Sequence, residues 1–351
     1  MKPEDFIKSM TKKDGVLVIF DNDADGISSA SLMVNCLKKL HGIEPYLISQ
    51  PMPTDKNLIS RVKTTLPTKI IIMDLAIDQQ KQVAEKLSGM APLLIIDHHQ
   101  ITNNINNKRI LHYNPRFRNS HIYQSTTYLT YKICSNLCDM TNRLWITGIG
   151  MTGDYDLKDS QDLVKEVCKK YNVDKDLYKT EFGRLVDIIS LANSSEIIKS
   201  ENIVNIIVKA GSMEDVMKNE SLINAYKIVQ TEIAFLDSDI QASTEMHKNL
   251  VLYELKTKYN LRAFVSTKLS EMHHEKIVVV YQKKGSKVKL SGRHQLGVFN
   301  VAKVLQDSAA SLKAGAGGHN NAAGGSVDVR DWDAYKLNLV EICRKLKNPI
   351  N

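Results

Sequence analysis

VLVIFDNDADG, residues 16–26, joins an apolar run to three closely spaced acids. The run at 16–20 is typical of a buried strand, and Asp21, Asp23 and Asp25 follow it at intervals of two. If the chain stays extended there, the three carboxylates point the same way. So much like charge requires a cation, and oxygen ligands without cysteine suit a hard or borderline metal such as Mg²⁺ or Mn²⁺.

The same arrangement, an apolar run followed by acids or histidines, recurs along the chain. The residues that follow these runs are Asp74 after 70–73, Asp97-His98-His99 after 93–96, and Asp154 after 145–149. Acids and imidazoles at the ends of several strands are how an open α/β sheet builds a metal site. Asp74 stands alone at its strand end, so we expect it to bridge two ions.

Two simpler explanations do not account for the first motif. The pattern D-x-D-x-D-G also begins an EF-hand loop, which needs a bidentate Glu at its twelfth position. Leu32 stands there, and the preceding segment is strand-like rather than helical, so an EF-hand is excluded. A helix N-cap explains one aspartate, for example Asp25, but not three.

The first hundred residues predict an α/β domain. Apolar strand-like runs alternate there with helical stretches; the strands are expected at 16–20, 45–48, 70–73 and 93–96, and the helices at 28–40, 58–66 and 79–87. This alternation is typical of βαβ units, so we expect a mostly parallel sheet covered by helices.

Helical periodicity dominates from about 123 to 236, and strand-like segments then return. The expected elements are strands at 250–255, 276–281 and 286–290, a helix at 299–308, a glycine-rich loop, and a last helix at 332–345. We therefore predict a catalytic domain at 1–195, a helical connector at 196–240 and a smaller C-terminal α/β domain at 241–351. The active site is expected in the cleft between the two domains.

Length and composition limit the number of domains, the kind of partner and the cellular compartment. The chain has 351 residues, more than one ordinary core holds, and its net charge of +8 permits an anionic partner. Five cysteines without framework spacing indicate a reducing compartment, and Cys134 and Cys138 are interpreted as core residues rather than zinc ligands. An acidic N-terminus and the lack of a long apolar segment predict a cytoplasmic protein that does not enter a membrane.

Two groups of basic residues lie near the motifs. They are Lys283, Lys284, Lys287, Lys289 and Arg293 in a hairpin-like segment, and His112, Arg116, Arg118 and His121 after the third motif. Each group is either a solvated turn or a phosphate contact.

The ordered set of motifs resembles the DHH phosphoesterases, whose name-giving motif stands here as Asp97-His98-His99. Residues 314–325, AGAGGHNNAAGG, are similar to the GGH…AAG motif of the DHH-associated domain, and Ser291-Gly292-Arg293 is similar to its S-x-R segment. Within this family the chain most resembles the RecJ-like single-strand exonucleases, followed by the nanoRNase and cyclic-dinucleotide phosphodiesterase branch. Asp21 stands where many relatives have His, and RecJ-like members often have Asp there.

The resemblance implies a role for each motif residue. The implied metal ligands are Asp21, Asp23, Asp25, Asp74, His98 and Asp154. His99 is expected to contact the scissile phosphate, and Asp97 is expected to orient a neighbouring imidazole. The implied substrate-binding residues are Ser291, Arg293, Gly317, Gly318 and His319. A mixed carboxylate and imidazole set favours two Mn²⁺ ions, with Mg²⁺ as a substitute.

We therefore predict a manganese-dependent phosphodiesterase. Three functions are considered, and the first is an exonuclease that degrades single-stranded DNA or RNA to mononucleotides. The second is an enzyme for small substrates: short oligonucleotides, cyclic dinucleotides or a phosphoadenosine phosphate. The third, a replication scaffold without catalysis, requires broken metal motifs, and the motifs here are intact. Expected partners are single-stranded nucleic acid or short oligonucleotides, a second copy of the chain in a homodimer, and replication or repair proteins.

Overall fold

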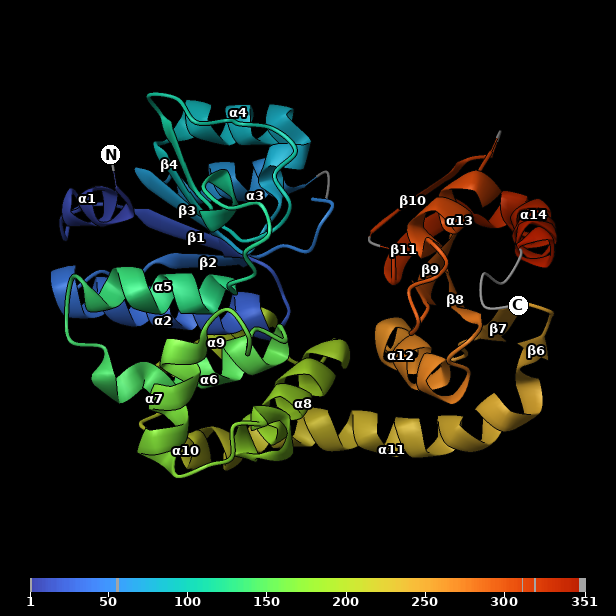
Figure 1. Ribbon diagram of the computed structural model, residues 1–351. Coiled ribbons are helices and arrows are strands. Elements are labelled where there is room, and N and C mark those ends of the chain that lie inside the picture. Colours follow the sequence, from blue (N-terminus) through green and yellow to red (C-terminus); the bar gives the residue numbers. More distant parts are fainter. Residues whose placement is uncertain (1, 55–56, 311, 319, 347–351) are drawn as a thin grey trace. The chain divides into compact units, whose positions relative to one another are not determined.

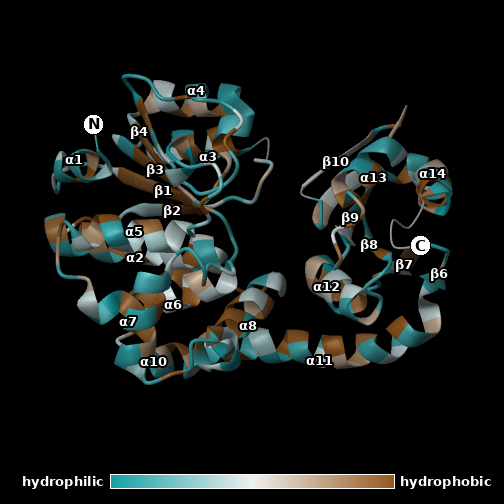
Figure 2. Cartoon of the chain, viewed as in Figure 1, coloured by the Kyte–Doolittle hydropathy of each residue, from teal (hydrophilic) through white to brown (hydrophobic). Residues whose placement is uncertain are grey.

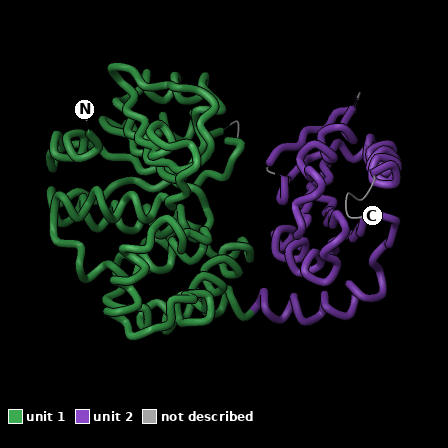
Figure 3. The backbone as a smooth tube through the Cα atoms, viewed as in Figure 1, with its two compact units in different colours: residues 1–227 green, residues 228–351 purple. Residues whose placement is uncertain are grey.

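A computed structural model describes residues 2–54, 57–310, 312–318 and 320–346. The chain divides into two compact units, residues 1–227 and residues 228–351 (Figure 3). Each unit has its own sheet and its own hydrophobic core. A long helix, α11 (Glu220–Ser243), contains the point at which the first unit ends and the second begins.

Unit 1 is built on a five-stranded sheet in which every pair of neighbours is parallel, as expected from the alternating pattern (Figure 1). Its spatial order is β2-β1-β3-β4-β5. The strands are β1 (Val16–Phe20), β2 (Tyr46–Ser49), β3 (Lys69–Met73), β4 (Leu93–Ile96) and β5 (Ile110–Tyr113). The sequence did not predict β5, because half of its four positions are only partly buried and it carries a histidine and a tyrosine.

Helices cover both faces of this sheet. Alternate residues of β1, such as Leu17 and Val18, pack into two different hydrophobic clusters. One cluster adds side chains from α3 (Leu58–Thr65) and α4 (Lys81–Met90), and the other from α2 (Ala24–His41) and the helices that follow β5. Burial on both faces explains the continuous apolar runs, which are brown in Figure 2.

The region after β5 is helical, as predicted. Its helices are α5 (Thr126–Ser135), α6 (Leu144–Gly153), α7 (Gln161–Tyr171), α8 (Glu181–Ser194), α9 (Ser200–Lys209) and α10 (Met213–Met217). The remaining helical elements of unit 1 are α1 (Pro3–Lys8), η1 (Ile77–Gln80), η2 (Pro115–Phe117), η3 (Thr141–Arg143) and η4 (Leu177–Lys179). The apolar stretch 145–149 lies inside α6, so the expectation that it precedes a strand-end acid is wrong.

Unit 2 contains a six-stranded mixed sheet of order β10-β11-β9-β8-β7-β6, in which only β7 and β8 pair in parallel among the described strands. The strands are β6 (Glu245–Met246), β7 (Leu250–Glu254), β8 (Ile277–Lys284), β9 (Lys287–Arg293), β10 (Ala314–Gly318) and β11 (Ala322–Asp328). The helices are α12 (Arg262–Met272), α13 (Val301–Ser308), η5 (Val329–Asp331) and α14 (Trp332–Lys345).

The glycine-rich segment corrects one prediction. The sequence indicated a loop, whereas the described residues of this segment form β10 and β11, paired antiparallel from Ala314 opposite Val327 to Gly318 opposite Ala323. Ladder hydrogen bonds use only the backbone, so a segment poor in side chains still forms a sheet edge.

Among the described residues, none of the helices has the length and apolar character required to cross a bilayer.

Candidate metal centre

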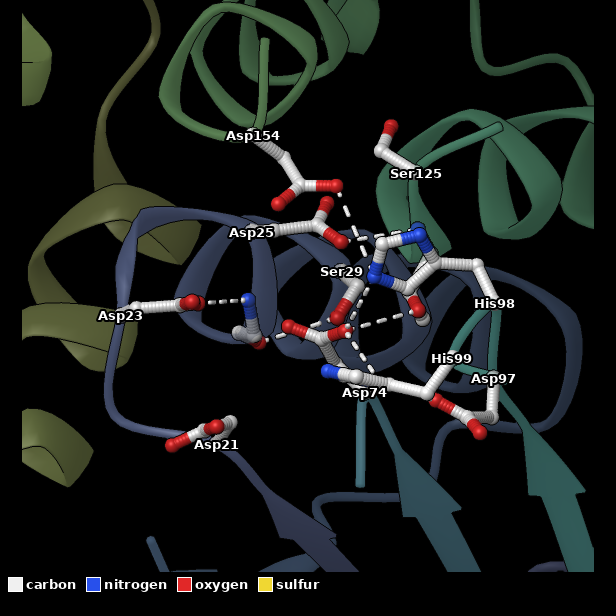
Figure 4. Close-up of polar contacts among 12 residues, drawn as sticks. Asp21, Asp23, Asp25, Ser29, Asp74, Asp97, His98, His99, Ser125 and Asp154 are labelled. Carbon is white, nitrogen blue, oxygen red and sulfur yellow. Dashed lines mark hydrogen bonds and ion pairs between the residues drawn. The ribbon is translucent and has the colours of Figure 1, made fainter. Parts of the chain in front are cut away.

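The predicted site residues of unit 1 gather at one edge of the parallel sheet (Figure 4). The chain runs outward from β1 in both directions, to β2 on one side and to β3 on the other. Such a reversal of strand order opens a crevice at the carboxyl ends of the two central strands. Asp21 directly follows β1, and Asp74 directly follows β3, so both acids flank this point.

The first motif turns from strand into helix sooner than expected. Asp23 is the N-cap of α2, and its Oδ1 accepts a 2.9 Å hydrogen bond from the Gly26 N–H. Asp25 lies in the first helical turn, so the prediction of an extended chain is wrong, and Asp23 rather than Asp25 caps the helix. A Cβ on Gly26 would lie 2.2 Å from the carbonyl oxygen of Asp21, so only glycine permits this tight turn.

Asp25 is buried and held by the start of a second helix. Its two carboxylate oxygens accept hydrogen bonds from the backbone N–H groups of Thr126 and Thr127, each 2.8 Å long. Both donors belong to the first turn of α5, whose N-terminal dipole favours a negative charge. The Thr127 hydroxyl also donates to the Asp25 carbonyl, so backbone and side chain of this acid are both fixed.

Asp74 is 2% exposed and has a left-handed backbone, with φ +60°. Its N–H donates to the Ile96 carbonyl at 3.0 Å, which continues the pairing of β3 with β4 past the strand end. Its Oδ1 accepts a 3.1 Å hydrogen bond from the Thr126 hydroxyl. Strained backbone is often found at functional sites, and here it accompanies the acid that was predicted to bridge the ions.

His98 lies between the acids. Its Nε2 is 3.4 Å from Asp74 Oδ1 and 3.5 Å from Asp154 Oδ2. Burial lowers the pKa of His98, with a further contribution from the neighbouring His99, so the neutral ring with a free lone pair is favoured. The Arg116 Nε–H donates to the His98 carbonyl at 2.7 Å and fixes this part of the loop.

Asp154 reaches the centre from the end of α6, where it is the C-cap (Figure 4). The Tyr123 hydroxyl donates to its Oδ2 and is 3.0 Å from that oxygen. The Tyr123 ring also packs edge-on against His98, with ring centroids 5.2 Å apart. The sequence analysis missed Tyr123 and Thr126, because a loop tyrosine and a helix-start threonine carry no spacing signal for a metal site.

Among the described residues, two sets of three ligand atoms are close enough to hold an ion, with all atoms of a set within 4.8 Å of one another. One set is Asp74, His98 and His99, and the other is Asp25, His98 and Asp154. Neither set includes Asp21 or Asp23, which lie to one side in Figure 4. Asp21 is still close enough to the others that, after burial, the charges of Asp23 and Asp74 raise its pKa.

The electrostatics of these acids fit a divalent cation. Burial, followed by the charge of Asp74, raises the pKa of Asp25 well above its usual range. Burial likewise raises the pKa of Asp74, and it raises that of Asp154 to about 10, with Asp25 as the next cause. The carboxylates of Asp25, Asp74 and Asp154 surround the neutral imidazole of His98, and among the described residues the nearby positive charge is that of His99, 3.9 Å from Asp74. One imidazolium does not balance these acids, and cations bound by oxygen and nitrogen would supply the remaining charge.

His99 pairs with Asp97 and also lies near Asp74, with its Nδ1 3.9 Å from Asp74 Oδ1. His99 Nδ1 is 2.7 Å from Asp97 Oδ1, and the carboxylate is buried while the imidazole is one-third exposed. Burial alone would lower the pKa of His99, but the hydrogen bond and charge of Asp97 outweigh it and raise the pKa to about 10. This contact is compatible with the predicted role of Asp97, the orientation of a neighbouring imidazole, which stays a prediction.

Asp97 has a second neighbour that the sequence did not indicate. His112, in β5, places its Nε2 4.0 Å from Asp97 Oδ2, and neither atom has a hydrogen-bond partner among the described residues. His112 is buried, so it does not lie at the surface with the other basic residues of its group.

The described members of the predicted substrate-binding set, Ser291, Arg293, Gly317 and Gly318, lie on β9 and β10. Ser291 is 7% exposed, and its hydroxyl is 2.9 Å from that of Ser266 in α12. Arg293 lies two residues further on the same strand, and no described carboxylate pairs with it. Gly317 and Gly318 are exposed in β10, and His319 lies outside the described residues.

Gly318 has a backbone that only glycine adopts freely, with φ +138°. A Cβ there would lie 2.5 Å from the Ala322 carbonyl oxygen. The end of β10 therefore exposes a stretch of backbone that carries no side chains.

The lysines of the β8–β9 hairpin are partly engaged with acids. Lys283 Nζ is 3.2 Å from Glu254 Oε1, and Lys287 Nζ is 3.8 Å from Asp328 Oδ2. These ion pairs reduce the charge that the hairpin offers to a phosphate chain.

The two units correspond to two known domains. Residues 15–151 match the DHH family, N-terminal domain, and residues 248–347 match the DHHA1 domain. No curated protein sequence matches the chain.

Solved structures with the same fold span nearly the whole chain. An exonuclease RecJ bound to manganese is 16% identical, with a TM-score of 0.72 over 99% of this chain and 94% of that one. RecJ from Thermus thermophilus in complex with Mn²⁺ is 13% identical, with a TM-score of 0.75 over 99% of this chain. This chain covers 55% of the Thermus protein.

A third similar structure is CDC45 from Entamoeba histolytica, which is 11% identical, with a TM-score of 0.56 over 98% of this chain and 97% of that one. At these identities the likeness shows the fold, and the two matched domains show the family. This chain belongs to the DHH family of metal-dependent phosphoesterases.

Proposed function

We propose that this protein is an exonuclease that hydrolyses single-stranded DNA or RNA to mononucleotides. The observation that carries the proposal is the cluster of Asp25, Asp74, His98 and Asp154 beside the carboxyl edge of the sheet, in which the first three are buried and Asp154 is partly exposed. These four residues, with Asp21 and Asp23 beside them, would hold two divalent cations, Mn²⁺ in preference to Mg²⁺ because one ligand is an imidazole. Such ions supply a water nucleophile at neutral pH and neutralise charge on the phosphate.

The side chains of the chain itself have distinct parts in the reaction. His99, protonated and partly exposed, would donate a hydrogen bond to a non-bridging oxygen of the phosphate, and Asp97 would keep its ring in that orientation. Water adds to phosphorus, the bond to the leaving sugar oxygen breaks, and the products are a phosphate monoester and a free hydroxyl. Thr126 and Tyr123 would hold Asp74 and Asp154 in place for this step.

A nucleic-acid substrate is supported by two observations. Similar folds belong to an exonuclease RecJ bound to manganese and to RecJ from Thermus thermophilus in complex with Mn²⁺. Unit 2 also contains Arg293, whose guanidinium has no carboxylate partner among the described residues and whose planar fork suits a phosphate. We propose that Ser291, Arg293, Gly317, Gly318 and His319 bind the substrate, in a domain at 241–351 that follows a catalytic domain at 1–195 and a connector at 196–240.

One observation favours a second candidate, a phosphodiesterase for small substrates. Two of the hairpin lysines that would follow a long strand are paired with Glu254 and Asp328. A dinucleotide or a cyclic dinucleotide would need the metal centre and Arg293 but not these lysines.

Strand length separates the two candidates. Purified protein with Mn²⁺ is incubated with single strands of two to thirty nucleotides, DNA and RNA, labelled at either end. An exonuclease degrades the long strands stepwise to mononucleotides, from one end. Cleavage of dinucleotides only would reject the exonuclease and support the small-substrate enzyme.

A further inference from the structure

A pair of tyrosines beside the metal centre has no part in the roles assigned above. Tyr155 directly follows Asp154, and its side chain is 74% exposed. Its ring stacks on Tyr178, with ring centroids 4.7 Å apart and the ring planes 28° from parallel. Tyr178 lies in η4, is only partly exposed, and donates its hydroxyl proton to the Thr152 carbonyl. Protein therefore backs one side of the Tyr155 ring, and most of the ring surface is open.

The backbone at Tyr155 is in a conformation that glycine usually adopts. Helix α6 ends in a Schellman motif: the Asp156 N–H donates to the Met151 carbonyl at 2.9 Å, and the Tyr155 N–H donates to the Thr152 carbonyl at 3.2 Å. The residue between the two bonds needs a positive φ, and Tyr155 has φ +57°. A bulky side chain at this position is strained, so local stability gives no reason for a tyrosine.

The surrounding contacts keep the turn from relaxing. Asp156 is buried, and its Oδ2 accepts hydrogen bonds from the Ser125 N–H at 2.7 Å and the Ser160 hydroxyl at 2.6 Å. Ser125 is also the N-cap of α5, the helix whose first turn holds Asp25. Tyr155 thus lies between Asp154, a candidate metal ligand, and Asp156, which is hydrogen-bonded to the N-cap of α5.

We propose that Tyr155, backed by Tyr178, is a stacking platform for a nucleobase of the substrate, on a nucleotide next to the phosphate that is hydrolysed. The inference rests on the proposed nuclease function and adds to it the site that recognises the base. Every base has a π face, so an aromatic platform accepts any sequence, as an exonuclease requires. The strained Tyr155 is next in sequence to Asp154, a candidate metal ligand. A base stacked on Tyr155 would therefore determine which phosphate of the strand reaches the ions.

The test combines a protein change with a substrate change. Steady-state kcat/KM is measured for parent, Tyr155→Gly and Tyr155→Phe on an intact oligonucleotide and on a series with one abasic residue at each of the first positions from either end. Tyr155→Gly should lower kcat/KM on the intact strand by roughly 5- to 100-fold. On the strand whose abasic residue falls at the platform, parent and variant should agree within about twofold. Tyr155→Phe keeps the ring and should behave as the parent does.

A stability measurement separates this role from packing. Relief of the backbone strain should raise the Tm of Tyr155→Gly by roughly 1–3 °C. A packing role for the ring would instead give a lower Tm and overturn the proposal. The control is Tyr46→Ala. Tyr46 is 56% exposed and begins β2, so it lies at the amino end of that strand, whereas the metal centre lies at the carboxyl ends of the strands. Its loss should leave kcat/KM unchanged.

The outcomes distinguish this inference from the proposed function. If the parent degrades single strands and Tyr155→Gly matches it on every substrate, the platform is wrong and the exonuclease stands. An equal loss on intact strands and on every abasic strand also overturns stacking. If the parent degrades no single strand at all, the proposed function fails, and this inference fails with it.

Discussion

Two regions of the molecule differ in the charge of their side chains. They are the carboxyl edge of the parallel sheet in unit 1 and the β9–β11 region of unit 2. The first collects buried negative charge, with Asp25 and Asp74 almost fully enclosed and held by hydrogen bonds from α5. The second offers a cation, Arg293, and the bare backbone of Gly317 and Gly318. We propose that the first region holds metal ions and that the second binds the phosphates and sugars of a substrate.

The two regions also differ in how tightly the fold fixes them. The acids of unit 1 lie at turns whose backbone conformation is restricted. Asp74 has a left-handed backbone, and at Gly26 there is no room for a Cβ. In unit 2 only part of the region is as constrained: Gly318 has φ +138° and leaves no room for a Cβ, whereas a Cβ on Gly317 would meet no atom within 4 Å. Changes in unit 1 should therefore affect chemistry, whereas changes in unit 2 should affect affinity.

The largest effect is expected from the acid predicted to bridge the ions. Asp74→Ala should lower kcat by roughly 10³-fold or more, because both ions lose a ligand. The measurement is single-strand hydrolysis with saturating Mn²⁺, and Asp139→Ala, an exposed acid of the same unit, serves as the control. Activity of Asp74→Ala within tenfold of the parent would remove this residue from the centre.

The adjacent histidines should separate metal binding from catalysis. His98→Ala should lose bound metal, whereas His99→Ala should keep it and lower kcat by roughly 10²-fold, because only the hydrogen bond to the phosphate is lost. Metal analysis of both purified variants, combined with their kcat values, decides this. Equal loss of metal in the two variants would show that both imidazoles are ligands.

In unit 2 the expected effect moves from kcat to KM. Arg293→Ala should raise KM for an oligonucleotide by roughly 10-fold, because a charge-assisted hydrogen bond to phosphate is lost, and should change little for a p-nitrophenyl phosphodiester. Arg330→Ala is the matched control, since Arg330 is already paired with Asp328. A similar loss on both substrates would mean that Arg293 acts on the chemistry or on the fold instead.

The smallest effect is expected from the hairpin lysines. Joint neutralisation of Lys283, Lys284 and Lys287 should reduce the slope of log affinity against log salt by roughly 0.7 for each single-strand phosphate that these lysines bind in the parent. Because Lys283 and Lys287 already pair with acids, we expect the three lysines to bind fewer than three phosphates. Binding titrations at several salt concentrations give the slope, and an unchanged slope would place long strands elsewhere on the protein.

Strands β1, β3 and β4 were predictable because they are buried on both faces and have continuous apolar runs, whereas the partly buried β5 has no such run. The end of β1 was harder to predict: local sequence does not show that α2 begins at once, with Asp23 as its cap. Tyr123 and Thr126 were missed because they act on acids far away in the sequence. The strands β10 and β11 were missed because glycine gives no hydropathy pattern, although its backbone pairs as well as any other.

The central claim is that the buried acids of unit 1 bind two catalytic ions. Crystals of the protein grown with Mn²⁺ and measured for anomalous scattering test it directly. We expect two anomalous peaks about 3.5–4 Å apart at the carboxyl edge of the sheet, with Asp74 between them and His98 on one of them. An absence of peaks at this edge, or peaks only elsewhere on the protein, would contradict the account.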